Sequence, residues 1–415
     1  MRILIYAMGS AGDVHPFLGL GRALQARGHE VFVATSAFFE ELVKRAGLEF
    51  RALGTVADFE RVQGDPHIWH PRKALASVVK NAVDPSYEAI LEIAKELHLP
   101  GQTVIVASSL AWGSFAARDL WGIPIVSVHL APSLFVSEYR QPVLHGAPVP
   151  QNAPRWMKRT QWWAAGRVVD FLVLPGLNRF RKSVGLPPAR NMLHSWHSPD
   201  RVLALFPDWF GPPQPDWPQQ TRITGFPMFD EAGIRDLPGD LADFLDGGEA
   251  PVIFTPGSAM DRGHSFFDEA VKALQMTGKR GILLSRFPDT IPSHLPEGIR
   301  HYPFVPFSQV LPRAAALVYH GGVGTCAQAL QAGIPHLLQP MAHDQLDTLS
   351  RVRDLCVGDG LHPRQFKAKR IAAMLDRLIG DTALKQRARE IGTRFRVKEW
   401  MNESCRVIEE AITKR

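Results

Sequence analysis

The 415-residue chain has only three cysteines, Cys326, Cys356 and Cys405, and none of them falls in a Cys-x-x-Cys or metal-ligand spacing. Such a small, odd number argues against a disulfide framework and is typical of a protein from a reducing compartment. Neither half of the chain contains the Gly-x-Gly-x-x-Gly fingerprint of dinucleotide-binding proteins, and this disfavours an NAD-dependent enzyme.

Long apolar runs are also missing. The two longest stretches without charge, residues 99–117 and 120–137, are interrupted by proline and glycine, so they predict buried strands and turns rather than membrane spans. The N-terminus becomes glycine-rich after eight residues, which indicates a first strand rather than a signal peptide. We therefore expect a cytoplasmic protein, and contact with the inner face of a membrane stays open.

The charge balance is modest. Lys and Arg number 47 and Asp and Glu number 41, and the net charge of +6 suits an anionic ligand or an acidic membrane surface. The excess of positive charge is too evenly spread along the sequence to indicate a nucleic-acid-binding protein. Hydrophobic residues make up 45% of the chain and charged residues 21%, which is ordinary globular usage and excludes disorder, collagen and coiled coil. The length predicts two domains.

Short apolar strands alternate with helical patterns in both halves of the chain, which predicts an α/β fold with two doubly wound parallel sheets. The expected strands lie at residues 2–7, 30–35, 103–107, 124–128, 251–255, 281–285, 314–320 and 334–340. We expect Rossmann-like domains at 1–215 and 216–395 that face each other across a cleft, and a helix at 396–415 that packs back on the first domain. The aromatic-rich region 134–198 predicts helical and loop excursions over the first sheet, and the proline-rich segment 206–218 predicts a linker.

A glycine-rich loop, residues 320–325 (His-Gly-Gly-Val-Gly-Thr), closes an expected strand and opens a helix. Free N–H groups at a helix N-terminus bind phosphate, and Thr325 and His320 add side-chain donors. The loop lacks the Gly-Lys-Ser/Thr of nucleotide hydrolases. A tight, capped turn is the structural alternative. Phe304-x-Pro306 before the loop and Asp344-Gln345 after it favour a binding site.

Together with residues 311–312, 332–335 and 343–345, this loop resembles the donor-binding signature of nucleotide-sugar glycosyltransferases of the GT-B fold. The resemblance extends to residues 9–16 (Gly-Ser-Ala-Gly-Asp-Val-x-Pro) and so covers both halves. Residues 64–66, 197–199, 205–210, 216–218 and 224–230 carry a narrower resemblance to the rhamnosyltransferases of rhamnolipid synthesis.

The resemblance implies a donor site made of ten residues: Ser258, Phe304, Val305, His320, Gly322, Gly324, Thr325, Gln328, Asp344 and Gln345. Phe304 would stack on the base where the family usually has tryptophan, and the backbone of Val305 would contact the base edge. His320, Ser258 and the glycine loop would hold the diphosphate, and Asp344 and Gln345 the sugar hydroxyls. Structural alternatives are a core role for Phe304, a turn hydroxyl for Ser258 and a helix cap for Asp344.

Gln328 departs from the family pattern, because many members have a glutamate there that accepts hydrogen bonds from both ribose hydroxyls. An amide oxygen is a weaker acceptor than a carboxylate. The loss of the carboxylate matters less for a deoxynucleotide, because it has no 2′-hydroxyl to bind. Gln328 therefore favours a dTDP-sugar over a UDP-sugar. The alternative is that the amide binds a ribose well enough.

Asp13 follows the first glycine turn. Its structural reading is an N-cap, with Pro16 in the first helical turn. The resemblance implies a catalytic base that takes the proton of the acceptor hydroxyl, and the helix terminus would keep Asp13 ionised. His15 is the rival base and otherwise an acceptor contact.

The chain contains no Asp-x-Asp, the pair that commonly holds a divalent cation in metal-dependent glycosyltransferases. We therefore expect no metal and no cofactor, with His320 and the helix N-terminus stabilising the diphosphate. A single displacement by the acceptor predicts inversion at the anomeric carbon.

Tryptophans in the region 134–198 suit an apolar acceptor: Trp162, Trp163 and Trp196. Each also suits an ordinary core. The narrower resemblance implies a hydroxy fatty acid dimer, a 3-(3-hydroxyalkanoyloxy)alkanoate. Four cations could bind its carboxylate, although a solvated surface explains them more simply: Arg155, Lys158, Arg159 and Arg181.

The preferred reaction moves L-rhamnose from dTDP-L-rhamnose to this acceptor. One alternative is a UDP-sugar glucosyltransferase acting on a hydrophobic natural product. The other is a catalytically inactive partner protein that binds a nucleotide sugar. The oligomeric state is left open.

Overall fold

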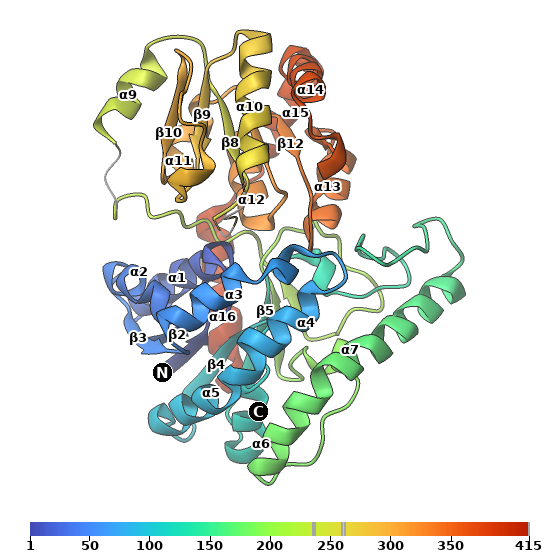
Figure 1. Ribbon diagram of the computed structural model, residues 1–415. Coiled ribbons are helices and arrows are strands. Elements are labelled where there is room, and N and C mark those ends of the chain that lie inside the picture. The colour runs from blue at the N-terminus through green and yellow to red at the C-terminus, as the bar shows by residue number, and fades with distance from the viewer. Residues whose placement is uncertain (235–237, 259, 261–262, 414–415) are drawn as a thin grey trace. The chain divides into compact units, whose positions relative to one another are not determined.

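The computed structural model describes residues 1–234, 238–258, 260 and 263–413, which form two compact units (Figure 1). Unit 1 comprises Met1–Pro227 and Arg396–Arg415, and unit 2 comprises Met228–Phe395. None of the described helices combines the length and the apolar character needed to cross a bilayer.

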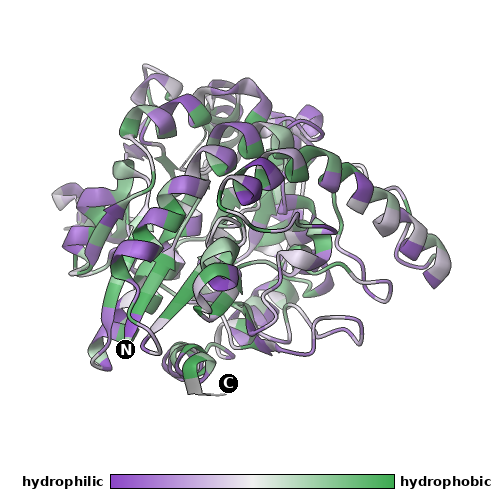
Figure 2. Ribbon diagram, turned by 90° about the horizontal axis from the view of Figure 1, so that it is seen from below, coloured by the Kyte–Doolittle hydropathy of each residue, from purple (hydrophilic) through white to green (hydrophobic). Residues whose placement is uncertain are grey.

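Unit 1 is built on a seven-stranded parallel sheet in the order β3-β2-β1-β4-β5-β6-β7. Its strands are β1 (Arg2–Tyr6), β2 (Glu30–Thr35), β3 (Glu49–Ala52), β4 (Thr103–Ser108), β5 (Ile125–His129), β6 (Arg201–Ala204) and β7 (Thr221–Ile223). Every residue of β4 and β5 is buried, as expected for central strands covered by helices on both faces, and the strands are largely apolar (Figure 2).

The helices of unit 1 are α1 (Ala11–Ala26), α2 (Glu40–Arg45), α3 (Val56–Gly64), α4 (Ala74–Val78), α5 (Asp84–Leu97), α6 (Ser114–Trp121), α7 (Arg155–Ser183), α8 (Met192–Ser195) and α16 (Val397–Thr413). A π-helical turn, Val79–Val83, joins α4 to α5. Short 3-10 turns lie at Ala37–Phe39, Pro66–Trp69 and Pro132–Leu134.

Unit 2 is built on a six-stranded parallel sheet in the order β10-β9-β8-β11-β12-β13. Its strands are β8 (Val252–Thr255), β9 (Gly281–Leu284), β10 (Ile299–Tyr302), β11 (Ala316–Tyr319), β12 (His336–Leu338) and β13 (Gly358–Gly360). The core on one face joins the sheet to two helices that pack together, α10 (His264–Thr277) and α14 (Ala368–Gly380).

The other helices of unit 2 are α9 (Gly239–Asp246), α11 (Phe307–Val310), α12 (Val323–Ala332), α13 (Gln345–Asp354) and α15 (Thr382–Gly392). Short 3-10 turns lie at Pro288–Thr290, Leu311–Arg313 and Pro363–Gln365. The expectation of two doubly wound α/β sheets is therefore confirmed, and each of the eight expected strands is present. The five strands not expected are β3, β6, β7, β10 and β13, and each contains a charged residue that interrupts the apolar run by which the other strands were recognised.

The proline-rich segment 206–218, expected as a linker, is part of unit 1. Its aromatic side chains Phe206, Phe210 and Trp217 are buried, and the Trp217 ring stacks on Phe135 with 4.4 Å between centroids. After it, β7 pairs with β6, so the chain leaves unit 1 at Pro227 instead of the expected residue 215.

Helix α16 packs on α1 and on strands β4, β5 and β6. The Trp400 ring occupies the space that a Cβ atom at Gly225 would need, and Ser404 Oγ donates to Thr224 Oγ1 at 2.9 Å. Arg27 adds two hydrogen bonds of 2.7 Å to the carboxylate of Glu409. These contacts explain why the last residues of the chain belong to unit 1.

Region 134–198, expected as helical and loop excursions, contains loops and the helices α7 and α8. The unexpected feature is the length of α7, a continuous 29-residue helix that packs against α4, α5 and α8. Pro175 lies inside the helix, and Gly176 follows it where a side chain would collide with Asp84 on α5. The alternating aromatic and polar residues of α7 obscure its helical period in the sequence.

Candidate active site

The predicted donor residues of unit 2 follow the carboxyl ends of four parallel strands. Ser258 follows β8, Phe304 and Val305 follow β10, His320 follows β11, and Asp344 follows β12. Because parallel strands end at the same edge of a sheet, all these loops lie at one edge, where doubly wound sheets bind ligands.

The glycine loop joins β11 to α12. Gly321 has a φ of 101°, a left-handed value that favours glycine, and Gly322 is the N-cap residue of α12. The N–H of Cys326 bonds to the Gly322 carbonyl at 3.0 Å, which leaves Val323, Gly324 and Thr325 in the first turn, where backbone N–H groups have no intrahelical acceptor. This turn is a suitable anion-binding element.

The His320 ring lies against two glycines. A Cβ atom at Gly257, in the loop after β8, would be 2.9 Å from Cε1 of the ring, and one at Gly322 would overlap Nε2. Gly257 also has a left-handed φ of 102°. The structure thus brings the loop carrying Ser258 next to His320, and it requires a glycine on each side of the imidazole.

His320 Nδ1 is buried and has no hydrogen-bond partner among the residues that the structure describes. Burial and, to a smaller extent, repulsion from His343 lower the pKa of His320 to about 4, so the ring is neutral at pH 7. A neutral imidazole carries one N–H, and an unsatisfied buried ring nitrogen at a helix N-terminus suits a phosphate oxygen. His343, in a left-handed turn with φ of 57°, belongs to the donor-binding signature but was given no role of its own from the sequence.

Gln345 is held from within the protein. Its Oε1 accepts hydrogen bonds from the N–H groups of Met341 (2.7 Å) and Ala342 (3.1 Å), and the side chain is buried. A Cβ atom at Gly321 would be 3.2 Å from Cβ of Gln345, so the glycine loop and the start of α13 touch. The side-chain carbonyl of Gln345 is therefore committed to the backbone.

Asp344 occupies the N-cap position of α13, but its side chain makes no capping hydrogen bond. The helix-cap alternative is therefore met in position but not by a side-chain hydrogen bond. Phe304 is half-buried and Val305 is buried. Gln328 is half-buried on α12, about one turn beyond Thr325. The donor roles of these residues stay predictions.

Beneath the glycine loop lies a buried polar group that the sequence did not suggest: Tyr319, Cys326 and His336. The Tyr319 hydroxyl and His336 Nδ1 are 3.1 Å apart. Burial raises the pKa of the Cys326 thiol to about 12 and lowers that of His336 to about 3, so both are uncharged at pH 7. Their residue types carry no recognisable spacing, and only the packing of β11, α12 and β12 brings them together.

In unit 1, Asp13 lies at the third position of α1, just after the carboxyl end of β1. Its Oδ2 accepts hydrogen bonds from the backbone N–H (2.8 Å) and the hydroxyl (2.9 Å) of Ser10. The expected N-cap role of Asp13 is wrong, because Ser10 is the N-cap and Asp13 completes a capping box. Gly9 has a φ of 133°, and a side chain there would collide with the carboxylate. His15 is half-buried on the same helix.

The predicted acceptor residues do not form one wall. Trp163 is two-thirds exposed on α7, whereas Trp162 is half-buried on the same helix. Trp196 packs against the core between α5, α6 and α7, and its indole N–H donates to His197 Nε2 at 2.9 Å.

The cations expected to meet an acceptor carboxylate have partners within the protein. Arg155 and Arg159 both pair with Glu138, and Lys158 donates to the Tyr139 carbonyl at 2.9 Å. Arg181 pairs with Asp119 at 2.9 Å. The solvated-surface alternative fits the exposed Arg155 and Arg159, whereas Lys158 and Arg181 are buried in structural contacts.

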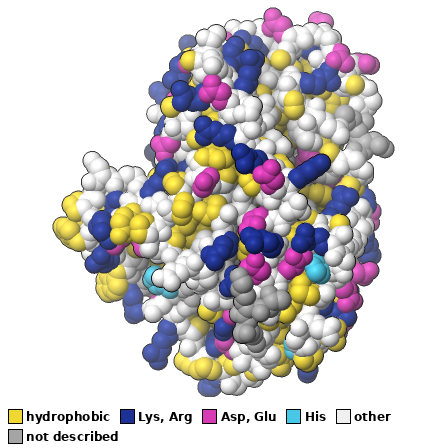
Figure 3. Space-filling view, turned by 180° about the vertical axis from the view of Figure 1, so that it is seen from behind, with side chains coloured by type: hydrophobic (Ala, Val, Ile, Leu, Met, Phe, Trp, Pro, Cys, Tyr) yellow, Lys and Arg dark blue, Asp and Glu magenta, His cyan; other side chains and the backbone are white. Residues whose placement is uncertain are grey.

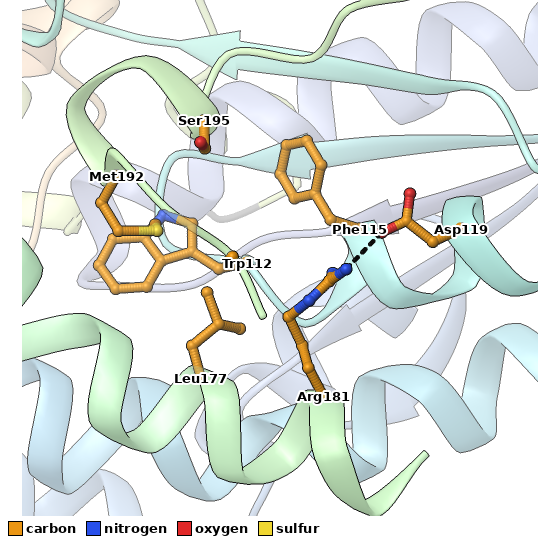
Figure 4. A pocket seen from close by; sticks show the side chains of 8 residues that line it. Trp112, Phe115, Asp119, Leu177, Arg181, Met192 and Ser195 are labelled. Carbon is orange, nitrogen blue, oxygen red and sulfur yellow. Dashed lines mark ion pairs between the residues drawn. The ribbon is translucent and has the colours of Figure 1, made fainter. Parts of the chain in front are cut away.

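Arg181 and Asp119 also line a pocket of about 200 Å³ on unit 1, which the sequence did not predict (Figure 4). The other lining residues are mostly apolar: Trp112, Phe115, Leu177, Ala189, Met192 and Ser195. The pocket lies between α6, α7 and the segment around α8.

Comparison with known proteins agrees with this arrangement. Residues 3–97 match the glycosyltransferase family 28 N-terminal domain, and residues 285–398 match the erythromycin biosynthesis protein CIII-like C-terminal domain. O-mycaminosyltylonolide 6-deoxyallosyltransferase of Streptomyces fradiae is 31% identical over 432 residues, which cover 99% of this chain and 97% of that protein.

Solved structures share the whole fold. The glycosyltransferase of kitacinnamycin superposes with a TM-score of 0.75 at 19% identity and covers 99% of both chains. A spinosyn rhamnosyltransferase solved with thymidine diphosphate gives a TM-score of 0.66 at 18% identity over 96% of both chains. The chain therefore belongs to the GT-B glycosyltransferases built from these two domain types, and it is a glycosyltransferase.

Proposed function

We propose that this enzyme is an inverting, metal-independent glycosyltransferase that moves a 6-deoxyhexose, with L-rhamnose preferred, from its dTDP donor to a hydroxyl of a hydrophobic acceptor. The observation that carries the proposal is the unpartnered Nδ1 of His320, among the described residues, beside the N-terminus of α12. A nucleotide sugar supplies the diphosphate that such a site suits.

In the proposed reaction, the acceptor oxygen forms a bond to the anomeric carbon as the bond from that carbon to the diphosphate oxygen breaks. The hydroxyl proton passes to Asp13, and the electron pair leaves with the diphosphate. The N–H groups of the first turn of α12 and the imidazole N–H of His320 stabilise this developing charge. Ser10, which donates twice to Asp13 Oδ2, orients the base.

The proposal assigns the role of a divalent cation to His320 and the helix N-terminus. Among the described residues, no group of three or more His, Cys, Asp or Glu side chains is placed to hold a metal ion. Transfer that is unaffected by a chelator, with product of inverted anomeric configuration by NMR, is the expected result. Loss of turnover in chelator, restored by Mg²⁺, would contradict the assignment.

Two observations favour the dTDP donor. Gln328 replaces the usual carboxylate that would bind a ribose, and the rhamnosyltransferase of similar fold was solved with thymidine diphosphate. For the acceptor, the relative from S. fradiae is named for a glycosylated macrolide, while the narrower sequence resemblance favours a hydroxy fatty acid ester. Both are hydrophobic molecules with a hydroxyl nucleophile.

A matrix of donors and acceptors tests the proposal. dTDP-L-rhamnose, dTDP-glucose and UDP-glucose are each combined with a 3-(3-hydroxyalkanoyloxy)alkanoate and with a macrolactone, and products are measured by mass spectrometry. We expect turnover with dTDP-L-rhamnose. Turnover with UDP-glucose alone would replace the proposal with the glucosyltransferase alternative. Binding of a nucleotide sugar without transfer to any acceptor would favour an inactive partner protein.

A further inference from the structure

The outward face of α7 is apolar. Trp156, Trp163, Val168 and Phe171 are 66%, 67%, 59% and 78% exposed. Trp156, Trp163 and Phe171 are separated by seven and eight residues, about two helical turns each, so they lie on one face. We call Trp156, Trp163, Val168 and Phe171 the α7 stripe.

The C-terminal half of α7 packs on the protein. Val173, Leu177 and Phe180 are buried in the core shared with α5 and α6. Trp156 and Trp163 precede the buried Leu177 by 21 and 14 residues, so they continue its buried face into the N-terminal half of the helix, where they are exposed. A surface helix normally directs polar side chains outward, and α7 reverses this pattern along its projecting part (Figure 1). A contiguous exposed apolar patch of this kind marks an interaction surface.

The residues of α7 carry mostly positive charge, although Glu138 neutralises Arg155 and Arg159, Asp119 pairs with Arg181, and Lys158 is buried. The helix has a single carboxylate, Asp170, and seven cations: Arg155, Lys158, Arg159, Arg167, Arg179, Arg181 and Lys182. Asp170 is itself occupied, because it accepts the N–H of Met192 at 2.8 Å. Arg167 is exposed and falls between Trp163 and Phe171 on the stripe. Figure 3 shows hydrophobic and basic side chains intermixed on the projecting segment at the left.

We propose that α7 docks unit 1 onto an anionic bilayer surface. Trp156, Trp163 and Phe171 enter the boundary between headgroups and acyl chains, and Arg167 meets lipid phosphates. Large aromatic side chains flanked by cations are the chemistry of an interfacial helix. A second copy of the chain is disfavoured as the occupant, because pairing of two α7 stripes would bring the exposed Arg167 of each copy into an apolar contact.

This inference does not depend on the transfer reaction proposed above. If the docking and the proposed transfer reaction are both correct, docking places the enzyme at the membrane surface, where hydrophobic acceptors concentrate. The test below uses no substrate, so its failure and the failure of the proposed reaction are distinguishable.

The experiment is flotation of the full chain with two kinds of vesicle: phosphatidylcholine alone, and equal parts of phosphatidylglycerol and phosphatidylcholine. We expect binding to the anionic vesicles, little binding to the neutral ones, and weakening as salt rises. The variant W163S/F171S should bind anionic vesicles at least roughly tenfold more weakly, because it lacks the two rings that the wild type buries in the interface. M276S, which removes a 55% exposed side chain on α10 of unit 2, is the control and should bind as wild type does.

The charge is tested in the same way. R167E should lower binding to anionic vesicles, and the identical change at the exposed Arg370 of α14, R370E, should have little effect. Because the substituted side chains are exposed, circular dichroism should show folded proteins.

Wild-type protein that stays unbound, or W163S/F171S that binds like wild type, would overturn the proposal. So would a wild-type dimer in light scattering that W163S/F171S converts to monomer without any vesicle binding, since this result would assign the stripe to a second copy.

Discussion

Gly257 and His320 touch across two loops of unit 2: a Cβ atom at position 257 would be 2.9 Å from Cε1 of the His320 ring. The contact orients the imidazole against the backbone after β8, with Nδ1 buried and unpartnered in the described part of the chain. A glycine in one loop thus determines how a histidine in another is presented to an anion.

Replacing Gly257 by alanine should weaken nucleotide binding. The residue has a left-handed φ of 102°, and the added methyl group would push the His320 ring aside. Strain of this kind costs of the order of 1–3 kcal/mol, and we expect the affinity for dTDP, measured by calorimetry, to fall roughly tenfold. Gly380 is the control, since nothing lies within 4 Å of its Cβ position, and G380A should bind dTDP normally. Equal affinities in G257A and wild type would mean that His320 does not contact the donor.

The proposed catalytic role of Asp13 can be tested apart from its capping role by comparison with a matched capping residue. Asp58 forms the same capping box at the start of α3, where its Oδ2 accepts the N–H of Thr55 at 2.9 Å and the Thr55 hydroxyl at 2.7 Å. D13N and D58N should each lose no more than about 1 kcal/mol of stability. Only D13N should lower kcat, by roughly 100-fold or more, with the affinity for dTDP unchanged. A normal kcat in D13N, measured by product formation, would exclude Asp13 as the base.

Gln328 should influence nucleotide choice. A glutamate at this position on α12 would offer ribose hydroxyls a charged acceptor, and hydrogen bonds to charged groups are the stronger ones. We expect Q328E to raise the affinity for UDP relative to that for dTDP by roughly tenfold. The ratio is measured by letting UDP and dTDP compete for the same site. A ratio that does not change would place Gln328 outside the nucleotide site.

Stability should fall in acid because of buried neutral histidines. Burial lowers the pKa of His336 to about 3, below its usual 6.5. Between these values the unfolded state binds a proton that the folded state does not, so the free energy of unfolding decreases as the pH falls from 6.5 toward 3. At pH 5 the difference from His336 amounts to about 2 kcal/mol, from 1.5 pH units at 1.36 kcal/mol each.

The comparison of wild type with H336Q checks this prediction. Glutamine can still hydrogen-bond to Tyr319 but does not titrate. Denaturant unfolding at pH 7 and pH 5 should show a smaller loss of stability in H336Q than in wild type. The same loss in both proteins would assign the acid sensitivity to other groups, such as His197, whose pKa burial also lowers to about 3.

The sequence by itself determined the features that depend on neighbouring residues. Apolar runs such as residues 103–107 predict central strands because both faces of a parallel sheet are buried, and the glycines at 321–324 predict an open turn because few other residues adopt it. The family signature lies in these local segments, which is why both the fold class and the enzyme class could be predicted.

Tertiary structure decided what depends on surfaces meeting across the chain. Only packing shows that Gly257 faces His320, that the Gln345 side-chain carbonyl is committed to Met341 and Ala342, and that Glu138 takes the charge of Arg155 and Arg159. Only packing shows which face of α7 stays exposed, since a tryptophan suits a core as well as a surface. A local pattern encodes the shape of an element, whereas the partner of each side chain is fixed by burial over the whole unit.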